Sequence, residues 1–296
     1  MLRPDYKEFL GLAREATLVP VVKSVSADLL TPVSAFLAIA ANEPNAFLLE
    51  SVERGEQIGR YSFLGARPYM QLQAHAGEVV LETDKRKTRE TQEKRQGGTI
   101  QVLKELLRQH HPAIVPGLPP FTAGAVGYFA YDAVRQLENI GEHAKDDLSL
   151  PDCVLMFFNR LLAFDHLRHQ IHIIATADVS RESPRRAYDR AAADIAVLEK
   201  KLAAGLRPAL WNKSSQKTNS KLKIQTASGR ERFIHSVQRA KQYIAAGDIF
   251  QVVLSQRQDF VPSVAPFDIY RALRAGNPSP YLYFLRMDNT DRKSVV

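Results

Sequence analysis

Apolar and polar positions form recognisable periods in the first part of the chain. Thr31-Pro32 precedes the apolar stripe of VSAFLAIAAN, and a capping hydroxyl followed by proline at the first helical position predicts a helix over residues 31–41. Residues 70–83 alternate between apolar and polar side chains on either side of Ala76-Gly77, which is the pattern of a half-buried β-hairpin.

A second and more apolar segment follows between residues 154 and 177. The run VLMFFNRLLAFDH is joined by a tight polar link to IHIIATA, which predicts a long hairpin covered on both faces over part of its length. Ser183-Pro184 then opens a strongly helical stretch, RRAYDRAAADIAVLEKKLAA, and Gly205 closes it in the manner of a helix C-terminal glycine.

The composition changes between Gly205 and Ser228. This segment is rich in Asn, Lys, Ser and Thr and poor in apolar residues, as linkers are, so we place a domain boundary there. Beyond it the pattern predicts a helix, a strand, a second helix and a second strand, at residues 229–246, 248–260, 266–275 and 281–287.

Composition narrows the class of protein. The 296 residues are 45% hydrophobic and 24% charged, which is typical of a globular protein. No apolar run approaches the roughly 18–20 residues that span a bilayer, and the N-terminal segment carries a charge every few residues, so we expect neither a membrane anchor nor a secretory signal. The single cysteine, Cys153, excludes an intramolecular disulfide and fits a reducing compartment, so we expect a cytoplasmic protein.

The net charge of +8 raises the alternative of a nucleic-acid binder. The surplus of basic residues lies mainly in 85–95, 181–190 and 213–232, which are rich in other polar residues and lack interleaved aromatic side chains. This distribution favours solvated loops and helix faces, and we expect no nucleic-acid partner.

The histidines have simpler explanations than metal binding. His110-His111 precedes a proline at a helix end and is interpreted as a capping or surface pair. His166, His169 and His172 surround a hairpin turn, where strand alternation does not produce a clean three-ligand site. We assign no metal to them.

Two further groups are interpreted as structural. Cys153 lies beside an apolar strand and is expected to be buried and inert. Gly124, Gly127 and Tyr128 do not follow the spacing of a dinucleotide-binding fingerprint, and close backbone packing in a sheet explains them better.

Four segments together resemble component I of anthranilate synthase, a family of chorismate-utilising enzymes. The segments are FLLESVERGEQIGRYSFLGAR (47–67), FTAGAVGYFAY (121–131), GDIFQVVLSQR (247–257) and NPSPY (277–281). The resemblance covers most of residues 18–290, and it is the combination of the four segments that makes it specific.

The resemblance implies a fold and a division of the chain. The fold is α+β, with antiparallel β-sheets and packed helices in a sandwich, and an N-terminal regulatory domain packs against a larger chorismate-binding domain. In this chain the resemblance gives a regulatory domain at 1–204, a linker at 205–228 and an incomplete chorismate-binding domain at 229–290. Residues 291–296, DRKSVV, depart from the family pattern and are expected to be a non-native tail.

The resemblance also implies a tryptophan-binding site. In the family, which opens tryptophan biosynthesis, the end product tryptophan binds between the LLES and NPSPY segments. Carried over residue by residue, the site in this chain consists of Glu50, Ser51, Asn277, Pro278, Ser279, Pro280, Tyr281 and Leu282. A serine hydroxyl, a carboxylate for an ammonium group and a proline-fixed turn with free carbonyls beside an aromatic ring suit such a ligand.

The same residues also have purely structural explanations. Glu50-Ser51 is also what a strand end turning into a loop contains, and NPSPY is also an ordinary rigid turn. Arg60 is a lesser candidate, better interpreted as a surface or interdomain ion-pair partner.

Gln251 is the one catalytic candidate in the chain. In relatives that add water to chorismate, a lysine that activates the water stands at the corresponding position, whereas here the residue is glutamine. Because a neutral amide cannot act as a base near neutral pH, this position favours an ammonia nucleophile. A strand glutamine bonded to its neighbours is the structural alternative.

By the resemblance, the full reaction converts chorismate and ammonia into anthranilate and pyruvate, with ammonia released from glutamine by a separate amidotransferase subunit. The family uses Mg²⁺, and its magnesium-binding glutamates and main catalytic residues are absent from this chain, which we therefore expect to be inactive alone. The alternatives are an aminodeoxychorismate synthase relative and a tryptophan-binding module without catalysis.

Overall fold

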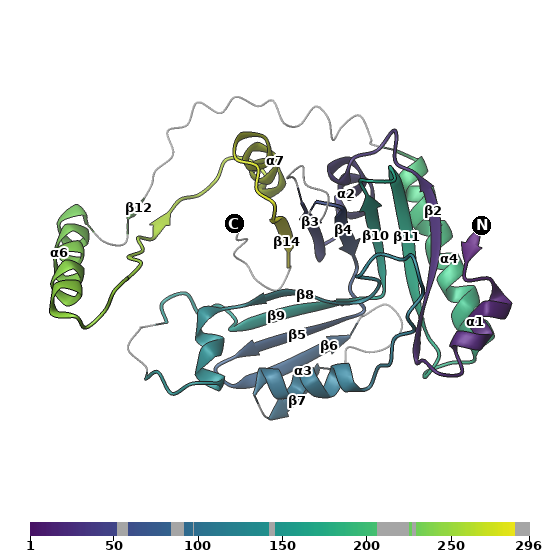
Figure 1. The fold of residues 1–296 in the computed structure, drawn as a ribbon, viewed down its shortest axis with the longest axis horizontal. Coiled ribbons are helices and arrows are strands. Elements are labelled where there is room, and N and C mark those ends of the chain that lie inside the picture. The colour runs from purple at the N-terminus through teal and green to yellow at the C-terminus, as the bar shows by residue number, and fades with distance from the viewer. Residues whose placement is uncertain are drawn as a thin grey trace. The chain divides into compact units, whose positions relative to one another are not determined.

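A computed structural model describes residues 1–51, 59–83, 92–96, 98–141, 146–205, 225–226 and 229–287. Within these residues the strands form two antiparallel sheets and one short pair (Figure 1). The helices are α1 (Tyr6–Leu12), α2 (Pro32–Ala40), α3 (Thr99–Arg108), the short 3-10 helix η1 (Tyr131–Gln136), α4 (Pro184–Ala203), α6 (Arg230–Ala246) and α7 (Pro266–Gly276).

The larger sheet has seven strands. In spatial order they are β1 (Leu2–Arg3), β2 (Leu18–Ser26), β11 (Gln170–Asp178), β10 (Arg160–Asp165), β4 (Tyr61–Ala66), β3 (Ala46–Glu50) and β14 (Leu282–Arg286). The smaller sheet has the order β7 (Gln92–Gln96), β6 (Glu78–Thr83), β5 (Met70–His75), β9 (Cys153–Phe158) and β8 (Gly124–Phe129), and the short pair consists of β12 (Gln225–Thr226) and β13 (Gln258–Asp259).

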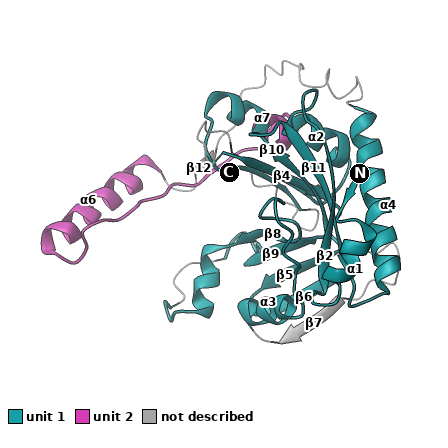
Figure 2. Cartoon of the chain, turned by 45° about the vertical axis from the view of Figure 1, so that its right-hand side comes forward, with its two compact units in different colours: residues 1–212, 270–296 teal, residues 213–269 magenta. Residues whose placement is uncertain are grey.

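The chain separates into two compact units (Figure 2). The first comprises Met1–Asn212 and Tyr270–Val296 and contains both large sheets, and the second comprises Lys213–Ile269 and contains α6 with the β12–β13 pair. Most of the segment 205–228 and all of 291–296 lie outside the described residues, so the expected linker and the expected tail stay predictions.

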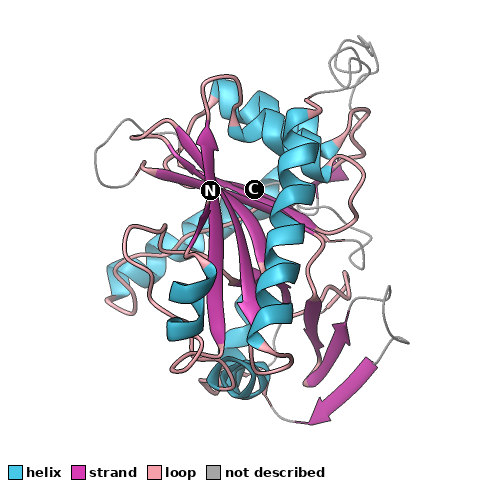
Figure 3. Cartoon of the chain, turned by 90° about the vertical axis from the view of Figure 1, so that its right-hand side faces the viewer, coloured by secondary structure: helices cyan, strands magenta, loops and turns pink. Residues whose placement is uncertain are grey.

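The main core lies between the two large sheets. Apolar side chains from both sheets meet there, among them Phe47, Leu161 and Ile174 from the seven-stranded sheet and Met156 and Phe158 from the other. The outer face of the seven-stranded sheet is covered by helices, and the long helix beside its strands is evident in Figure 3. These layers bury apolar area on both faces of the sheet, which is why β10 and β11 are apolar almost throughout.

Helix α3 covers the outer face of the smaller sheet. Its buried Val102 and Leu106 pack against Leu72 of β5 and Leu155 of β9. The first unit therefore stacks helix, sheet, sheet and helix, which is the α+β sandwich that the resemblance implied.

Several expected elements are confirmed at nearly the expected residues. Helix α2 begins after Thr31, whose hydroxyl accepts a hydrogen bond from the Ser34 amide at 3.1 Å, with proline at its first turn. The 70–83 hairpin forms as β5 and β6, and its turn residues Ala76 and Gly77 have φ of 49° and 83°. Helices α4, α6 and α7 and strand β14 also form where the pattern predicted them.

The expected long hairpin at 154–177 is wrong in its first arm. That arm is divided at Asn159 into β9, which pairs with β5 and β8, and β10, which pairs with β11 and β4. The apolar run is therefore long because it passes from one sheet to the other through the shared core. The apolar pattern of a sequence does not show that its two halves pair with strands of different sheets.

The expected strand at 248–260 is also wrong over most of its length. Only Gln258–Asp259 form a strand, and residues 251–257 have no regular secondary structure. Val253 is 83% exposed, so the β-branched side chains of this segment do not pack on a neighbouring strand. Strand propensity reflects packing against such neighbours more than an intrinsic backbone preference.

Two structural interpretations of single residues are confirmed. A Cβ at Gly127 of β8 would lie 1.8 Å from the Val154 carbonyl oxygen of β9, so close backbone packing explains this glycine. Cys153 is buried, and burial raises the pKa of its thiol to about 12, which keeps it protonated and unreactive near neutral pH.

Candidate functional site

Strands β3 and β14 bring the two predicted site segments together. They pair antiparallel, with Leu282 opposite Glu50 and Arg286 opposite Ala46. Ser51 follows the paired end of β3 and Tyr281 precedes the paired end of β14, so both lie at the same end of this ladder. Residues 277–281 connect α7 to β14 at this end, and the eight residues of the expected site are therefore neighbours in the fold (Figure 1).

The register assigns these residues to two faces of the sheet. Leu49 and Leu285 contact the core between the two sheets. Because side chains alternate along a strand, Ser51 and Tyr281 share that face, whereas Glu50 points to the opposite face, which α2 and α7 cover. The site thus has a polar anchor on the helix side and a serine and a tyrosine on the sandwich side.

Glu50 is held by two side chains of α7. Its Oε2 accepts hydrogen bonds from the Tyr270 hydroxyl at 2.5 Å and from Arg274 Nε at 2.9 Å, and the residue is only 4% exposed. Burial raises the pKa of the Tyr270 phenol, and the hydrogen bond to Glu50 raises it further, so the phenol stays a donor. The carboxylate that was expected to meet a ligand ammonium group already joins β3 to α7.

Sequence reasoning missed Tyr270 and Arg274. They are four residues apart on α7, so they lie on one face of the helix, directly before the NPSPY turn. This spacing is visible in the sequence, but the partner of the pair, Glu50, is 220 residues away from Tyr270 and only the fold reveals it.

Ser51 offers the polar group on the other face. Its Oγ is buried and has no hydrogen-bond partner among the described residues. A buried hydroxyl without a partner is uncommon in folded proteins and often marks a place where a ligand or a water molecule binds. Tyr281 is 72% exposed beside it, and its amide donates to Ser279 Oγ at 3.4 Å.

Arg286 fixes β14 to the end of helix α2. Its Nη1 donates to the carbonyl oxygens of Ala40 at 2.7 Å, Ala41 at 3.2 Å and Glu43 at 3.1 Å. These carbonyls lie at the helix C-terminus, where backbone acceptors lack partners in the helix and the macrodipole favours a cation. Burial lowers the pKa of Arg286.

The lesser candidate Arg60 forms an ion pair. Its Nη2 lies 2.8 Å from Asp165 Oδ2, and Asp165 is nearly fully buried. Burial opposes ionisation of this carboxyl, but the hydrogen bonds from Arg60 and from backbone amides outweigh it and hold the pKa of Asp165 below its usual range.

The catalytic candidate Gln251 lies in the second compact unit. It is exposed and belongs to residues 251–257, which have no regular secondary structure. The strand glutamine bonded to its neighbours is therefore not observed, and the catalytic role of Gln251 stays a prediction.

In the part of the chain that the structure describes, no group of three or more His, Cys, Asp or Glu side chains is arranged to hold a metal ion. None of the described helices combines the length and apolar character needed to cross a bilayer.

Comparison with known sequences identifies the family of this chain. The pattern of the family described as chorismate binding enzyme matches residues 44–295, which span β3, β14 and α7. The chain therefore belongs to the chorismate-binding enzymes.

Proteins of that class that are similar to this chain include anthranilate synthase subunits. Anthranilate synthase component 1 of Acetivibrio thermocellus is 37% identical over 97% of this chain and 57% of the relative, and that of Mycobacterium tuberculosis H37Rv is 39% identical over 96% and 55%. A crystal structure of anthranilate synthase component I from Streptococcus pneumoniae TIGR4 matches with a TM-score of 0.63 and 26% identity, covering 88% of this chain and 54% of the other. The chain thus spans about half the length of these relatives.

Proposed function

We propose that this chain belongs to the anthranilate synthase type of chorismate-binding enzyme and that the end of the β3–β14 ladder binds L-tryptophan as a feedback effector. The observation that carries the proposal is the strand pairing that sets Leu282 opposite Glu50, because it brings Ser51 and Tyr281 to one end and one face of the ladder. The buried, unpartnered Ser51 hydroxyl beside an exposed aromatic ring supports it.

In this proposal the two faces of the ladder have different roles. On the sandwich face, the Ser51 hydroxyl bonds a polar group of the amino acid and the Tyr281 ring lies against the indole. The turn at 277–280 offers backbone carbonyls to the ammonium group, because its prolines lack an N–H that would compete for them. On the helix face, Glu50 holds α7 through Tyr270 and Arg274 and so fixes the position of the turn.

The proposed reaction is the conversion of chorismate and ammonia into anthranilate and pyruvate, with ammonia supplied by a glutamine amidotransferase partner. Gln251 favours ammonia over water as the nucleophile, since its neutral amide cannot generate hydroxide. Mg²⁺, when bound, would hold the carboxylate of chorismate. The described residues supply no cluster of side chains that fits this ion.

Calorimetric titration tests the effector site. We expect the chain to bind one equivalent of L-tryptophan and to bind D-tryptophan at least tenfold more weakly, since the enantiomer presents the same indole with a misplaced ammonium group. Ser51→Ala should weaken L-tryptophan binding about tenfold or more, because it removes one buried hydrogen bond of about 1.4 kcal/mol. Ser236→Ala on α6, which removes a serine from the second unit, is the matched control and should bind as the parent chain does.

Equal binding of both enantiomers, or an unchanged affinity in Ser51→Ala, would contradict the effector site. Activity is tested separately by incubating the chain with chorismate, ammonium and magnesium. We expect no anthranilate from this chain alone, and anthranilate formation above the rate without protein would overturn that expectation. Release of aminodeoxychorismate instead would favour the alternative relative.

A further inference from the structure

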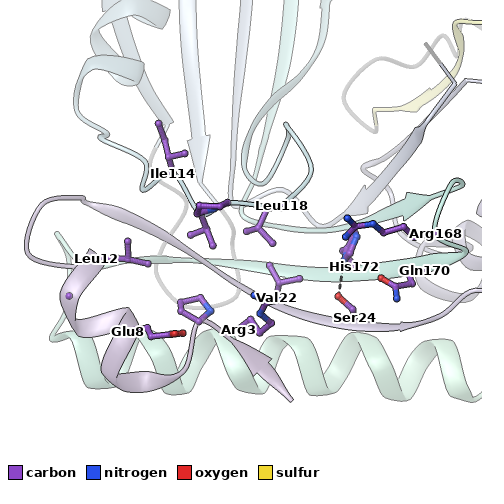
Figure 4. A pocket seen from close by; sticks show the side chains of 15 residues that line it. Arg3, Glu8, Leu12, Val22, Ser24, Ile114, Leu118, Arg168, Gln170 and His172 are labelled. Atoms are coloured by element: carbon purple, nitrogen blue, oxygen red, sulfur yellow. Dashed lines mark hydrogen bonds between the residues drawn. The ribbon is translucent and has the colours of Figure 1, made fainter. Parts of the chain in front are cut away.

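A cavity lies toward the opposite edge of the seven-stranded sheet from the proposed effector site. It has a volume of about 630 Å³ and is formed by β2, β11, α1 and residues 114–118 (Figure 4). Strands β10 and β4 separate β11 from β3 in the sheet, so these two strands are roughly 14 Å apart at ordinary strand spacing. Small-molecule sites typically enclose about 300–1,000 Å³.

We propose that this cavity binds a small organic anion that carries an apolar body. The anionic group is received at the end lined by Arg168, Gln170 and His172, and the body is received between apolar side chains at the other end. The proposal does not rest on the proposed function, because it concerns different residues.

The polar end contains donors that the fold leaves available. His172 is 4% exposed, and its Nδ1 lies 2.8 Å from Ser24 Oγ, which fixes the orientation of the ring. Its Nε2 has no hydrogen-bond partner among the described residues. When Ser24 donates to Nδ1, the Nε2 carries the proton and becomes a donor, which suits an anionic oxygen.

Arg168 supplies the charge at this end. Its guanidinium forms no ion pair with any residue that the structure describes, since the nearby Asp165 carboxylate is bound by Arg60 at 2.8 Å. Figure 4 shows Arg168, Gln170 and His172 together on one side of the pocket, with Ser24 bonded to His172. An arginine without an acidic partner beside a buried imidazole favours a carboxylate or phosphate group.

The other end of the pocket is apolar. Leu12 of α1, Val22 of β2 and Leu118 line it, and Ile114 lies there 89% exposed (Figure 4). Arg3 and Glu8 both line the pocket away from Arg168, and their opposite charges offset each other there, whereas no acidic lining residue stands beside Arg168 (Figure 4). An inorganic anion alone would leave this apolar surface unused, which is why the ligand class includes an apolar body.

Isothermal titration with 2-naphthoate tests the proposal, with 2-naphthamide as the neutral ligand of the same shape and inorganic phosphate as the anion without an apolar body. We expect one equivalent of 2-naphthoate to bind the full chain at least tenfold more tightly than either control ligand. Arg168→Gln should weaken 2-naphthoate binding at least tenfold and leave 2-naphthamide binding unchanged. Arg14→Gln removes an exposed arginine that does not line the pocket and is expected to bind as the parent does.

Three results would overturn the proposal. Equal affinity for 2-naphthoate and 2-naphthamide would mean that the pocket accepts apolar rings without recognising charge. Equal losses in Arg168→Gln and Arg14→Gln would mean that net charge, rather than this pocket, attracts the anion. Displacement of 2-naphthoate by L-tryptophan in direct competition would mean that both ligands occupy the β3–β14 site, whereas additive binding supports two independent sites.

Discussion

At the scale of single residues, Glu50 connects two parts of the chain that are more than two hundred residues apart in sequence. Glu50 is the last residue of β3, and the two hydrogen-bond partners of its carboxylate lie on α7. Helix α7 is followed by the turn and by β14, and β14 pairs with β3. A buried carboxylate is retained only where donors offset its desolvation, and here a tyrosine and an arginine do so. The position of the 277–281 turn therefore depends on this one side chain.

Replacing Glu50 with Gln should lower the free energy of unfolding by about 1–3 kcal/mol, because it removes charge-assisted hydrogen bonds from a buried site. Urea unfolding followed by circular dichroism measures this loss. Asp189→Asn is the control, since it breaks the exposed Arg185–Asp189 pair on α4 and should cost only about 0.3–0.5 kcal/mol. Equal losses in both variants would mean that the Glu50 contacts contribute no more than a surface pair.

His172 makes the stability of the fold depend on pH. Burial lowers the pKa of its imidazole, Arg168 and Arg60 act in the same direction, and Asp165 opposes them. The unfolded chain, with a histidine pKa of about 6.5, therefore binds this proton at a higher pH than the folded chain does. The contribution of His172 to stability is fully present above about pH 6.5 and is lost as the pH falls toward the folded-state pKa.

His172→Asn should consequently flatten the decline in the free energy of unfolding between pH 7.5 and pH 5. Asparagine keeps a polar atom near Ser24 and does not titrate in this pH range, so the variant isolates the effect of the imidazole. Urea unfolding at each pH measures the free energy of unfolding. Parallel pH profiles for the parent and the variant would show that another group causes the decline.

At the scale of elements, the close approach of β8 and β9 depends on a glycine. Gly127→Ala would place a methyl group against the Val154 carbonyl, so the two strands must separate, and we expect a loss of more than about 3 kcal/mol. Gly11→Ala in α1 is the matched substitution: its Cβ meets no atom within 4 Å, and alanine favours a helix by up to about 1 kcal/mol. Thermal unfolding of both variants tests the pair, and a small loss in Gly127→Ala would contradict the assigned packing.

The elements that could be predicted from the sequence are those determined by neighbouring residues. Thr31-Pro32 begins α2 through its own hydroxyl and its own fixed φ, and the Ala76-Gly77 turn determines the β5–β6 register locally. The division of the apolar run at Asn159 could not be predicted, because it depends on which strands from elsewhere in the chain pair on each side. The failed strand at 248–260 has the same cause, since Val252 and Val253 have strand propensity but no neighbouring strand.

The candidate site could likewise be predicted only in part. The resemblance assigned Ser51 and Tyr281 to one site, and the pairing of Glu50 with Leu282 brings them to the same end of the β3–β14 ladder. The ion pair of Arg274 with Glu50 and the contact of Arg286 with the end of α2 required the fold, because each joins residues more than two hundred positions apart. The resemblance indicated which residues could bind, and the tertiary structure shows which contacts hold them in place.

At the scale of the whole molecule, burial is distributed unevenly between the two compact units. Helix α4 in the first unit buries Ala187, Ala191, Ile195 and Leu202 against its neighbours, whereas α6 in the second unit has no buried residue. In proteins most helical stability comes from a packed apolar face rather than from helix propensity. The two helices therefore differ in stability although both have a strong helical pattern and a C-terminal glycine.

Hydrogen exchange followed by mass spectrometry measures this difference directly in the intact chain. Amides of α6 should exchange by local unfolding, with protection at least about a hundredfold lower than that of α4, whose opening requires loss of the core beside β11. L-tryptophan should raise the protection of β14 and leave α6 unchanged, because the proposed effector site lies within the first unit. Equal protection of α4 and α6 without ligand would mean that α6 is covered in solution by contacts that its exposed Ile234, Val237 and Ile244 do not make here.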